Sequence, residues 1–89
     1  MKAVIWSKAS CPHCVQAKAL MNRFEIQYEE RTLGEGWTPD QLFEQCDADN
    51  IPRPRSAPQI WINDNYIGGY DQLVTFMEDT HSGSTEGQL

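Results

Sequence analysis

The sequence has few basic residues, few cysteines and no long apolar run. Seven lysines and arginines stand against thirteen aspartates and glutamates, and the resulting net charge of −6 argues against nucleic acid or an anionic membrane as a partner. No apolar segment approaches the roughly 20 residues of a membrane-spanning helix, and the first residues lack the pattern of a secretory signal. We therefore expect a cytoplasmic protein, and its 89 residues allow one small domain.

Two of the three cysteines form the motif Cys11-Pro12-His13-Cys14. A Cys-x-x-Cys pair occurs in redox sites and also as half of many zinc sites. A tetrahedral zinc site needs two more ligands, and the available candidates are Cys46, His13 and His81, none of which forms a second close pair. In the cytoplasm, paired cysteines are more often catalytic than structural. The spacing therefore favours a redox pair, with a metal site as the alternative.

The motif follows the apolar run Ala3-Val4-Ile5-Trp6 and lies at the expected start of a helix. Free N–H groups and the helix dipole at such a start would stabilise a Cys11 thiolate. Pro12 suits the first helical turn, and Cys14 would meet Cys11 on one face of the helix. This arrangement suits a nucleophilic Cys11 with Cys14 as its resolving thiol. Cys46 is expected to be a small buried or half-buried apolar residue rather than a third redox thiol.

The remaining patterns predict alternating strands and helices. Strands are expected over residues 2–6, 25–31, 59–62 and 66–68, with a tight turn at 63–65. Helices are expected over residues 11–23, from Pro39 behind the N-cap Thr38, and after Asp71. The first helix is expected to bury the following side chains: Val15, Ala17, Leu20, Met21 and Phe24.

This order predicts an α/β fold in which the first two strands are parallel and the last two form a hairpin. The fold class is a four-stranded mixed sheet flanked by three helices. Residues 1–79 would form this domain. Residues 80–89 are small and polar without periodicity, and they are expected to form a flexible C-terminal tail.

Two features near the cysteines have both a structural and a functional interpretation. Lys8 is either a solvated loop charge or a cation that favours a thiolate or a ligand carboxylate. Gly68 and Gly69 either serve only a turn or expose N–H groups at a helix start, where they can hold a carboxylate.

Three segments resemble, in order, the signature segments of the glutaredoxins: Lys8-x-x-Cys11-Pro12-x-Cys14, Arg55-Ser56-Ala57-Pro58-Gln59-Ile60 and Gly68-Gly69-Tyr70-Asp71. The resemblance covers residues 2–78, and the small size is similar to that of phage and bacterial glutaredoxins. It implies a thioredoxin fold in which Pro58 follows a cis peptide bond and lies beside the cysteine pair.

The resemblance also implies a glutathione:disulfide oxidoreductase with Cys11 as nucleophile and Cys14 as resolving thiol. It would need no metal or organic cofactor, because glutathione donates the electrons. The residues that match glutathione-binding positions are Lys8, Arg55, Ala57, Pro58, Gly69, Tyr70, Asp71 and Gln72. Lys8 and Arg55 would hold the glycine carboxylate, and the helix start after Gly69 would hold the γ-glutamyl end. The partners would be glutathione and disulfide-containing or glutathionylated proteins, bound by a monomer.

Three departures from the usual family pattern involve His13, the pair Ser56-Ala57, and Gln72. His13 replaces a tyrosine, and a histidinium there would make the disulfide more oxidising. Ser56-Ala57 replaces Thr-Val before Pro58, and Gln72 replaces an acidic residue, which weakens one contact to the glutathione ammonium. Two alternative functions are a redoxin that thioredoxin reductase reduces and that serves ribonucleotide reductase, and an iron–sulfur cluster carrier.

Overall fold

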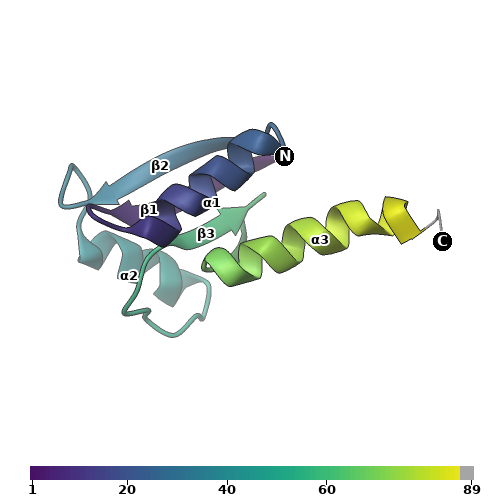
Figure 1. The fold of residues 1–89 in the computed structure, drawn as a ribbon. Helices are drawn as coiled ribbons and strands as arrows, with labels where there is room; N and C mark the ends of the chain where they lie inside the picture. The colour runs from purple at the N-terminus through teal and green to yellow at the C-terminus, as the bar shows by residue number, and fades with distance from the viewer. Residues whose placement is uncertain (87–89) are drawn as a thin grey trace.

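The fold is a four-stranded mixed sheet flanked by three helices, as the sequence predicts (Figure 1). The computed structural model describes residues 1–86, with side chains through residue 79. The elements in chain order are β1 (Lys2–Lys8), α1 (Pro12–Arg23), β2 (Gln27–Leu33), α2 (Pro39–Ala48), β3 (Gln59–Ile62), β4 (Asn65–Gly68) and α3 (Tyr70–Glu86). Within this described part, no helix is both long and apolar enough to cross a membrane.

The sheet has the strand order β2-β1-β3-β4. β1 runs parallel to β2, as a helical crossover requires, and antiparallel to β3. Asn63 and Asp64 have φ angles of 51° and 68°, which is the geometry of a two-residue hairpin turn between β3 and β4. Trp6 pairs with Gln59, so the segment before β3 lies at the carboxyl end of β1. The loops that carry residues 9–11 and 55–58 therefore meet at one end of the sheet.

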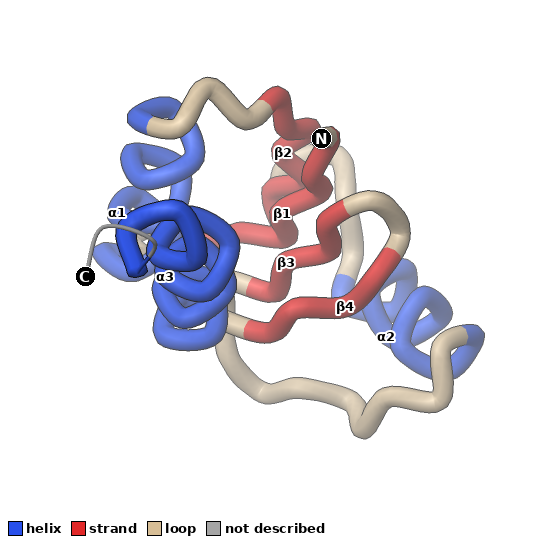
Figure 2. The backbone as a smooth tube through the Cα atoms, turned by 90° about the vertical axis from the view of Figure 1, so that its right-hand side faces the viewer, coloured by secondary structure: helices blue, strands red, loops and turns tan. Residues whose placement is uncertain are grey.

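The two faces of the sheet hold separate apolar clusters because side chains alternate along β1. Ala3 and Ile5 pack with Met21 of α1 and Leu73 of α3. Trp6 lies in the other cluster, with residues of α2. Figure 2 shows the same layers, with α1 and α3 on one side of the sheet and α2 on the other. Burial on both faces explains why β1 is a nearly continuous apolar run.

The N-terminus of α2 has the cap that the sequence predicts. The Thr38 hydroxyl accepts a hydrogen bond from the Gln41 N–H at 3.3 Å, and the Gln41 side-chain oxygen accepts one from the Thr38 N–H at 2.8 Å. Pro39 occupies the first turn, where its missing N–H is not needed. This reciprocal capping box fixes the point at which α2 begins.

The second strand begins later than predicted, at Gln27 rather than residue 25. Glu25 adopts a left-handed conformation with φ 56°, and the Ile26 N–H donates to the Met21 carbonyl at 2.9 Å. These are features of a Schellman ending of α1, which uses residues 24–26 before the chain can extend. The strand also ends later than the predicted residue 31, since β2 continues to Leu33.

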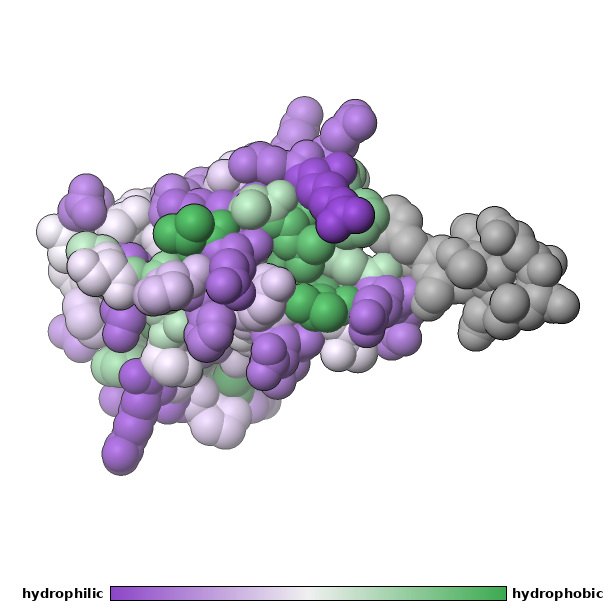
Figure 3. Space-filling model, viewed as in Figure 1, coloured by the Kyte–Doolittle hydropathy of each residue, from purple (hydrophilic) through white to green (hydrophobic). Residues whose placement is uncertain are grey.

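One residue predicted to lie on the inner face of α1 is exposed. The others are buried or half-buried, as predicted: Ala17, Leu20, Met21 and Phe24. Val15 is instead 61% exposed, because Cys14 takes the inward position and the next residue lies about 100° around the helix. On the face shown in Figure 3, hydrophobic surface gathers where α1 meets α3. Half-buried apolar side chains of both helices pack against the core there.

The last helix extends further than the sequence indicates. α3 runs to Glu86, whereas an irregular tail is predicted from residue 80. No proline follows Pro58, and small polar residues lower helix propensity without preventing a helix. The flexibility of this segment stays a prediction, and residues 87–89 of the predicted tail lie outside the described residues.

Candidate active site

Cys11 and Cys14 form a disulfide at the start of α1, with their Cα atoms 5.2 Å apart. Cys11 is the N-cap residue, and its Sγ accepts a hydrogen bond from the Cys14 N–H at 3.1 Å. In the reduced protein, this N–H group and the helix dipole would favour a Cys11 thiolate. Cys11 is 8% exposed and Cys14 only 2%, so Cys11 is the more accessible of the two. Pro12 occupies the first turn of the helix, as predicted.

Pro58 lies beside this disulfide, and the Ala57–Pro58 peptide bond is cis, as the family resemblance implies. The Cys11 Sγ lies 3.7 Å from the Ala57 carbonyl oxygen. Pro58 is buried, whereas Ala57 is half-buried and keeps part of its surface accessible. The chain segment before β3 therefore forms one wall of the disulfide site.

A cavity of about 160 Å³ joins this wall to the start of α3. His13 and Tyr70 both line it and stack on each other with nearly parallel rings, their centroids 5.9 Å apart. The residues that line the cavity are His13, Ser56, Ala57, Pro58, Gly69, Tyr70, Asp71 and Gln72. Six of the eight predicted glutathione-binding residues are thus together in one place, next to His13.

Gln72 is engaged within the protein. Its side-chain oxygen accepts a hydrogen bond from the Gly69 N–H at 2.9 Å, so it caps the start of α3. The Gln72 side chain also packs onto Gly68, where a Cβ atom would lie only 2.9 Å from the Gln72 Cγ. The N–H of Gly69 therefore already has a hydrogen-bond partner within the protein. The polar groups of this cavity that remain for a ligand include the first turn of α3 and the Asp71 side chain.

A second cavity, of about 220 Å³, lies on the other side of Ala57. Lys8 and Arg55, the remaining predicted glutathione-binding residues, line it together with Ser56 and Ala57. Among the described residues, neither Lys8 nor Arg55 forms an ion pair. Two unpaired cations therefore share one cavity next to the disulfide, which suits an anionic ligand.

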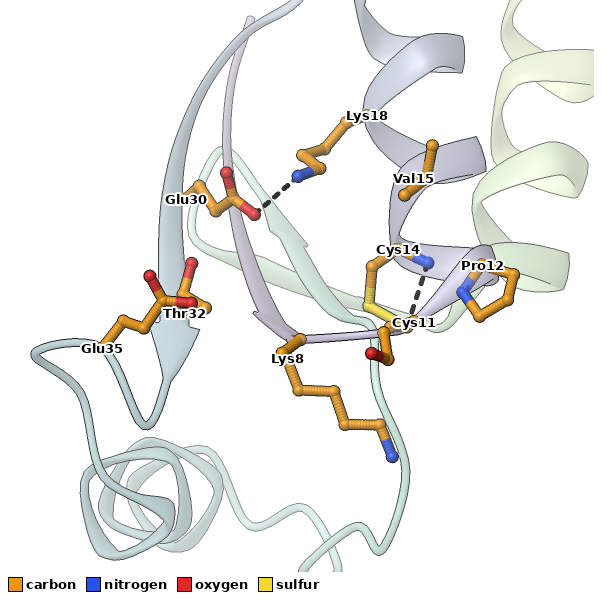
Figure 4. Close-up of a pocket in the computed structure, with 11 residues that line it drawn as sticks. Lys8, Cys11, Pro12, Cys14, Val15, Lys18, Glu30, Thr32 and Glu35 are labelled. Atoms are coloured by element: carbon orange, nitrogen blue, oxygen red, sulfur yellow. Dashed lines mark hydrogen bonds and ion pairs between the residues drawn. A yellow bond between two sulfur atoms is a disulfide. The ribbon is translucent and has the colours of Figure 1, made fainter.

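A third and larger cleft, of about 670 Å³, opens beside both cysteines and between α1 and β2. Its polar wall includes Lys18, Glu30, Thr32 and Glu35 (Figure 4). Lys8 also borders this cleft, but its side chain is directed away from Glu30. Sequence reasoning did not identify these four residues as part of the site. The spacing of Lys18 four residues after Cys14 is the one available signal, because it places both on one face of α1.

Glu30, a residue of β2, links Lys18 of α1 to Ser7 of β1. One carboxylate oxygen accepts hydrogen bonds from the Lys18 ammonium and from the buried Ser7 hydroxyl, both at 2.7 Å. The Lys18 hydrogen bond, followed by that of Ser7, holds the pKa of the Glu30 carboxyl below its ordinary value of 4.5. These contacts favour the ionised carboxylate in the folded state.

We expect Glu30→Gln to lower the free energy of unfolding at neutral pH by ~1 kcal/mol, because the ion pair is partly exposed and one hydrogen bond is partly buried. The pKa of Glu30 is lower in the folded state, so this contribution is complete above about pH 4.5 and is lost as pH falls through the folded-state pKa. Urea unfolding between pH 3 and 7 measures the difference. Glu44→Gln, on an exposed residue of α2, is the control. A difference that stays constant down to pH 3 would contradict the assignment.

Cys46 is a free, fully buried thiol, as predicted. It lies in the apolar cluster that also contains Trp6, Leu42 and Trp61. Burial raises the pKa of this thiol, with smaller contributions from Asp47 and Asp49. A thiol in this environment is a poor nucleophile. Within the described residues, no three His, Cys, Asp or Glu side chains gather in a way that could hold a metal ion.

Residues 3–67 match the family model for glutaredoxin. The chain is 36% identical over 70 residues to glutaredoxin 1 of Rickettsia bellii, covering 79% of this chain and 70% of that protein. The crystal structure of glutaredoxin 1 from Francisella tularensis, complexed with cacodylate, is similar with a TM-score of 0.74 and 25% identity, covering 89% and 94% of the two chains.

The structure of a buckwheat glutaredoxin–glutathione complex has the same fold, with a TM-score of 0.62 and 24% identity over 88% of this chain and 69% of the other. The family model covers the segment from β1 to β4, which includes the Cys11–Cys14 disulfide and Pro58. The chain thus belongs to the glutaredoxin family and is a thiol–disulfide oxidoreductase.

Proposed function

We propose that this protein is a dithiol glutaredoxin that uses glutathione to reduce protein disulfides and glutathione mixed disulfides. The observation that carries this proposal is the position of Ala57 between two cavities. One cavity contains the start of α3, and the other contains the unpaired cations Lys8 and Arg55. Cys11 lies next to Ala57, 3.7 Å from its carbonyl oxygen. An extended tripeptide with its cysteine at this point would have one end in each cavity.

The charges of the two cavities match those of glutathione. Its glycine carboxylate would lie at Lys8 and Arg55, where charge-assisted hydrogen bonds are strong. Its γ-glutamyl carboxylate would lie at the first turn of α3, and its ammonium at Asp71. The buckwheat glutaredoxin was solved as a complex with glutathione, which supports a tripeptide ligand for the family member described here.

The substrate disulfide is reduced by two thiol–disulfide exchanges. The Cys11 thiolate attacks one sulfur of the substrate disulfide, forms a mixed disulfide and releases the other sulfur as a thiolate. The Cys14 thiol loses its proton and attacks the Cys11 sulfur, which releases the second substrate thiol and leaves the Cys11–Cys14 disulfide. Two glutathione molecules then reduce this disulfide and become glutathione disulfide. The cytoplasm, where the glutathione pool is reducing, is the proposed location, and a monomer is the proposed state.

Turnover with two electron donors tests this function. Reduction of bis(2-hydroxyethyl) disulfide should depend on glutathione, with NADPH and glutathione reductase regenerating it. NADPH with thioredoxin reductase alone should support little turnover. The reverse result would favour a redoxin that takes its electrons from a flavoprotein and would overturn the glutathione site.

His13 is expected to tune the redox potential of the pair. A positive charge on the His13 side chain at the start of α1 would favour the Cys11 thiolate, and hence the reduced protein, so His13→Tyr should lower the reduction potential by roughly 15–30 mV. A tyrosine retains an aromatic ring that can stack on Tyr70, as His13 does, so the KM for glutathione should change little. Equilibration in glutathione redox buffers measures the potential. A potential unaltered within error would rule out this role.

A further inference from the structure

The cavity that contains Lys8 and Arg55 has more apolar wall than glutathione can cover. Its apolar lining is Leu33, Pro39, Leu42, Phe43 and Pro54. Glycine, the residue of glutathione that would reach this cavity, has no side chain. With glutathione bound, the apolar wall would therefore remain in contact with water, which is unfavourable.

The wall is built on well-supported residues. Leu42 belongs to the buried cluster around Cys46, so it forms a rigid floor. Phe43 is half-buried, and the Arg53 guanidinium lies 5.3 Å from its ring centroid. Arg53 in turn forms an ion pair with Asp47 at 2.8 Å. Arg53, in the loop that follows α2, therefore holds the Phe43 side of the cavity in place.

The size of the cavity suits a side chain. Its volume is about 220 Å³. An apolar cavity of roughly 150 Å³ is enough to hold a benzene molecule. A leucyl or phenyl side chain therefore fits against Leu42 and Phe43.

The charge of the cavity identifies the kind of group beside that side chain. No acidic residue lines the cavity, and its cations Lys8 and Arg55 form no ion pair within the described part of the chain. An apolar side chain next to a free carboxylate matches both properties. These two groups occur together at the C-terminal residue of a peptide.

We propose that this cavity is a subsite for the C-terminal residue of a cysteine peptide, and that it prefers an apolar residue there to glycine. The peptide carboxylate lies at Lys8 and Arg55, and the apolar side chain lies against Leu42 and Phe43. This inference rests on the proposed function, because it keeps the peptide cysteine between Ala57 and Cys11. The chemistry is the same exchange: the substrate disulfide becomes two thiols, and the protein dithiol becomes the Cys11–Cys14 disulfide.

Two matched substrates test the preference. They are mixed disulfides of 2-mercaptoethanol with γ-Glu-Cys-Gly and with γ-Glu-Cys-Leu, each mixed with the reduced protein. Cys11 attacks the peptide sulfur and releases 2-mercaptoethanol, so acid quenching and chromatography of the released 2-mercaptoethanol give the second-order rate constants. Partial burial of the leucyl side chain predicts a rate constant about five to twenty times that of the glycine peptide.

Phe43→Ala should bring this ratio close to one, because it removes the aromatic wall. Phe76→Ala is the matched control, since Phe76 is a half-buried phenylalanine of α3 that does not line the cavity. It should keep the ratio of the unmodified protein. A ratio of one or below in the unmodified protein, or a preference that survives Phe43→Ala, would overturn the subsite while leaving the proposed function in place. Failure of both peptides, with bis(2-hydroxyethyl) disulfide still reduced by the protein, would overturn the proposed function as well.

Discussion

Replacement of Cys11 by serine is expected to abolish disulfide exchange, with kcat/KM falling by roughly a thousandfold or more. Cys11 is the N-cap of α1, and its sulfur accepts a hydrogen bond from the Cys14 N–H. It is therefore the thiol that the helix start activates. A serine hydroxyl at the same place cannot form a mixed disulfide. Cys46→Ala is the control and should keep activity, since Cys46 is buried away from this site.

Cys14→Ser is expected to separate two classes of substrate. The protein should still turn over glutathionylated substrates, because a second glutathione can release the mixed disulfide at Cys11. It should lose activity on protein disulfides, where the resolving thiol is needed. An active Cys11→Ser protein and an inactive Cys14→Ser protein on glutathionylated substrates would reverse the two roles.

Arg55→Ala is expected to raise the KM for a glutathionylated substrate by about five- to thirtyfold, which is the range for a partly exposed charge-assisted contact. Arg55 is exposed and forms no ion pair with the described residues, so its charge is available to a ligand. The effect on bis(2-hydroxyethyl) disulfide, which carries no charge, should be much smaller when the pre-reduced protein reduces it in a single turnover without glutathione. Initial rates with the glutathionylated substrate and single-turnover rates with the uncharged disulfide give the comparison.

Arg53→Ala is the matched control for this effect. Arg53 lies in the same loop but already pairs with Asp47, and it does not line the cavity that contains Lys8. Its loss should change the KM for a glutathionylated substrate far less than the loss of Arg55. Equal losses for Arg55→Ala on charged and uncharged substrates would show that Arg55 supports the loop rather than a ligand.

Local signals in the sequence predicted most of the fold. Thr38 with Pro39 marked the start of α2, and Asn63-Asp64 marked the hairpin turn, because both depend on nearest-neighbour chemistry. The prediction for the inner face of α1 was wrong at Val15, because Cys14 occupies the inward position instead. The predicted start of β2 was too early, because Glu25 has the left-handed conformation of a helix ending. Glycine usually occupies that position.

The site was predictable only in part. The spacing of Cys11 and Cys14 at a helix start indicated the redox pair, and the resemblance supplied the cis bond before Pro58, which composition cannot reveal. The contact of Glu30 with Lys18 and Ser7 depends on the register of β2 against β1 and on the packing of α1. No short-range pattern encodes that register, so these residues were missed.

Trapping of the glutathione adduct tests the central claim most directly. Cys14→Ser protein, reduced and then incubated with glutathione disulfide, should retain one glutathione per chain. Peptide mass spectrometry should place that glutathione on Cys11, because the resolving thiol that would expel it is absent. An adduct on Cys46 instead, or no adduct under conditions in which bis(2-hydroxyethyl) disulfide modifies Cys11, would contradict a glutathione site beside Cys11.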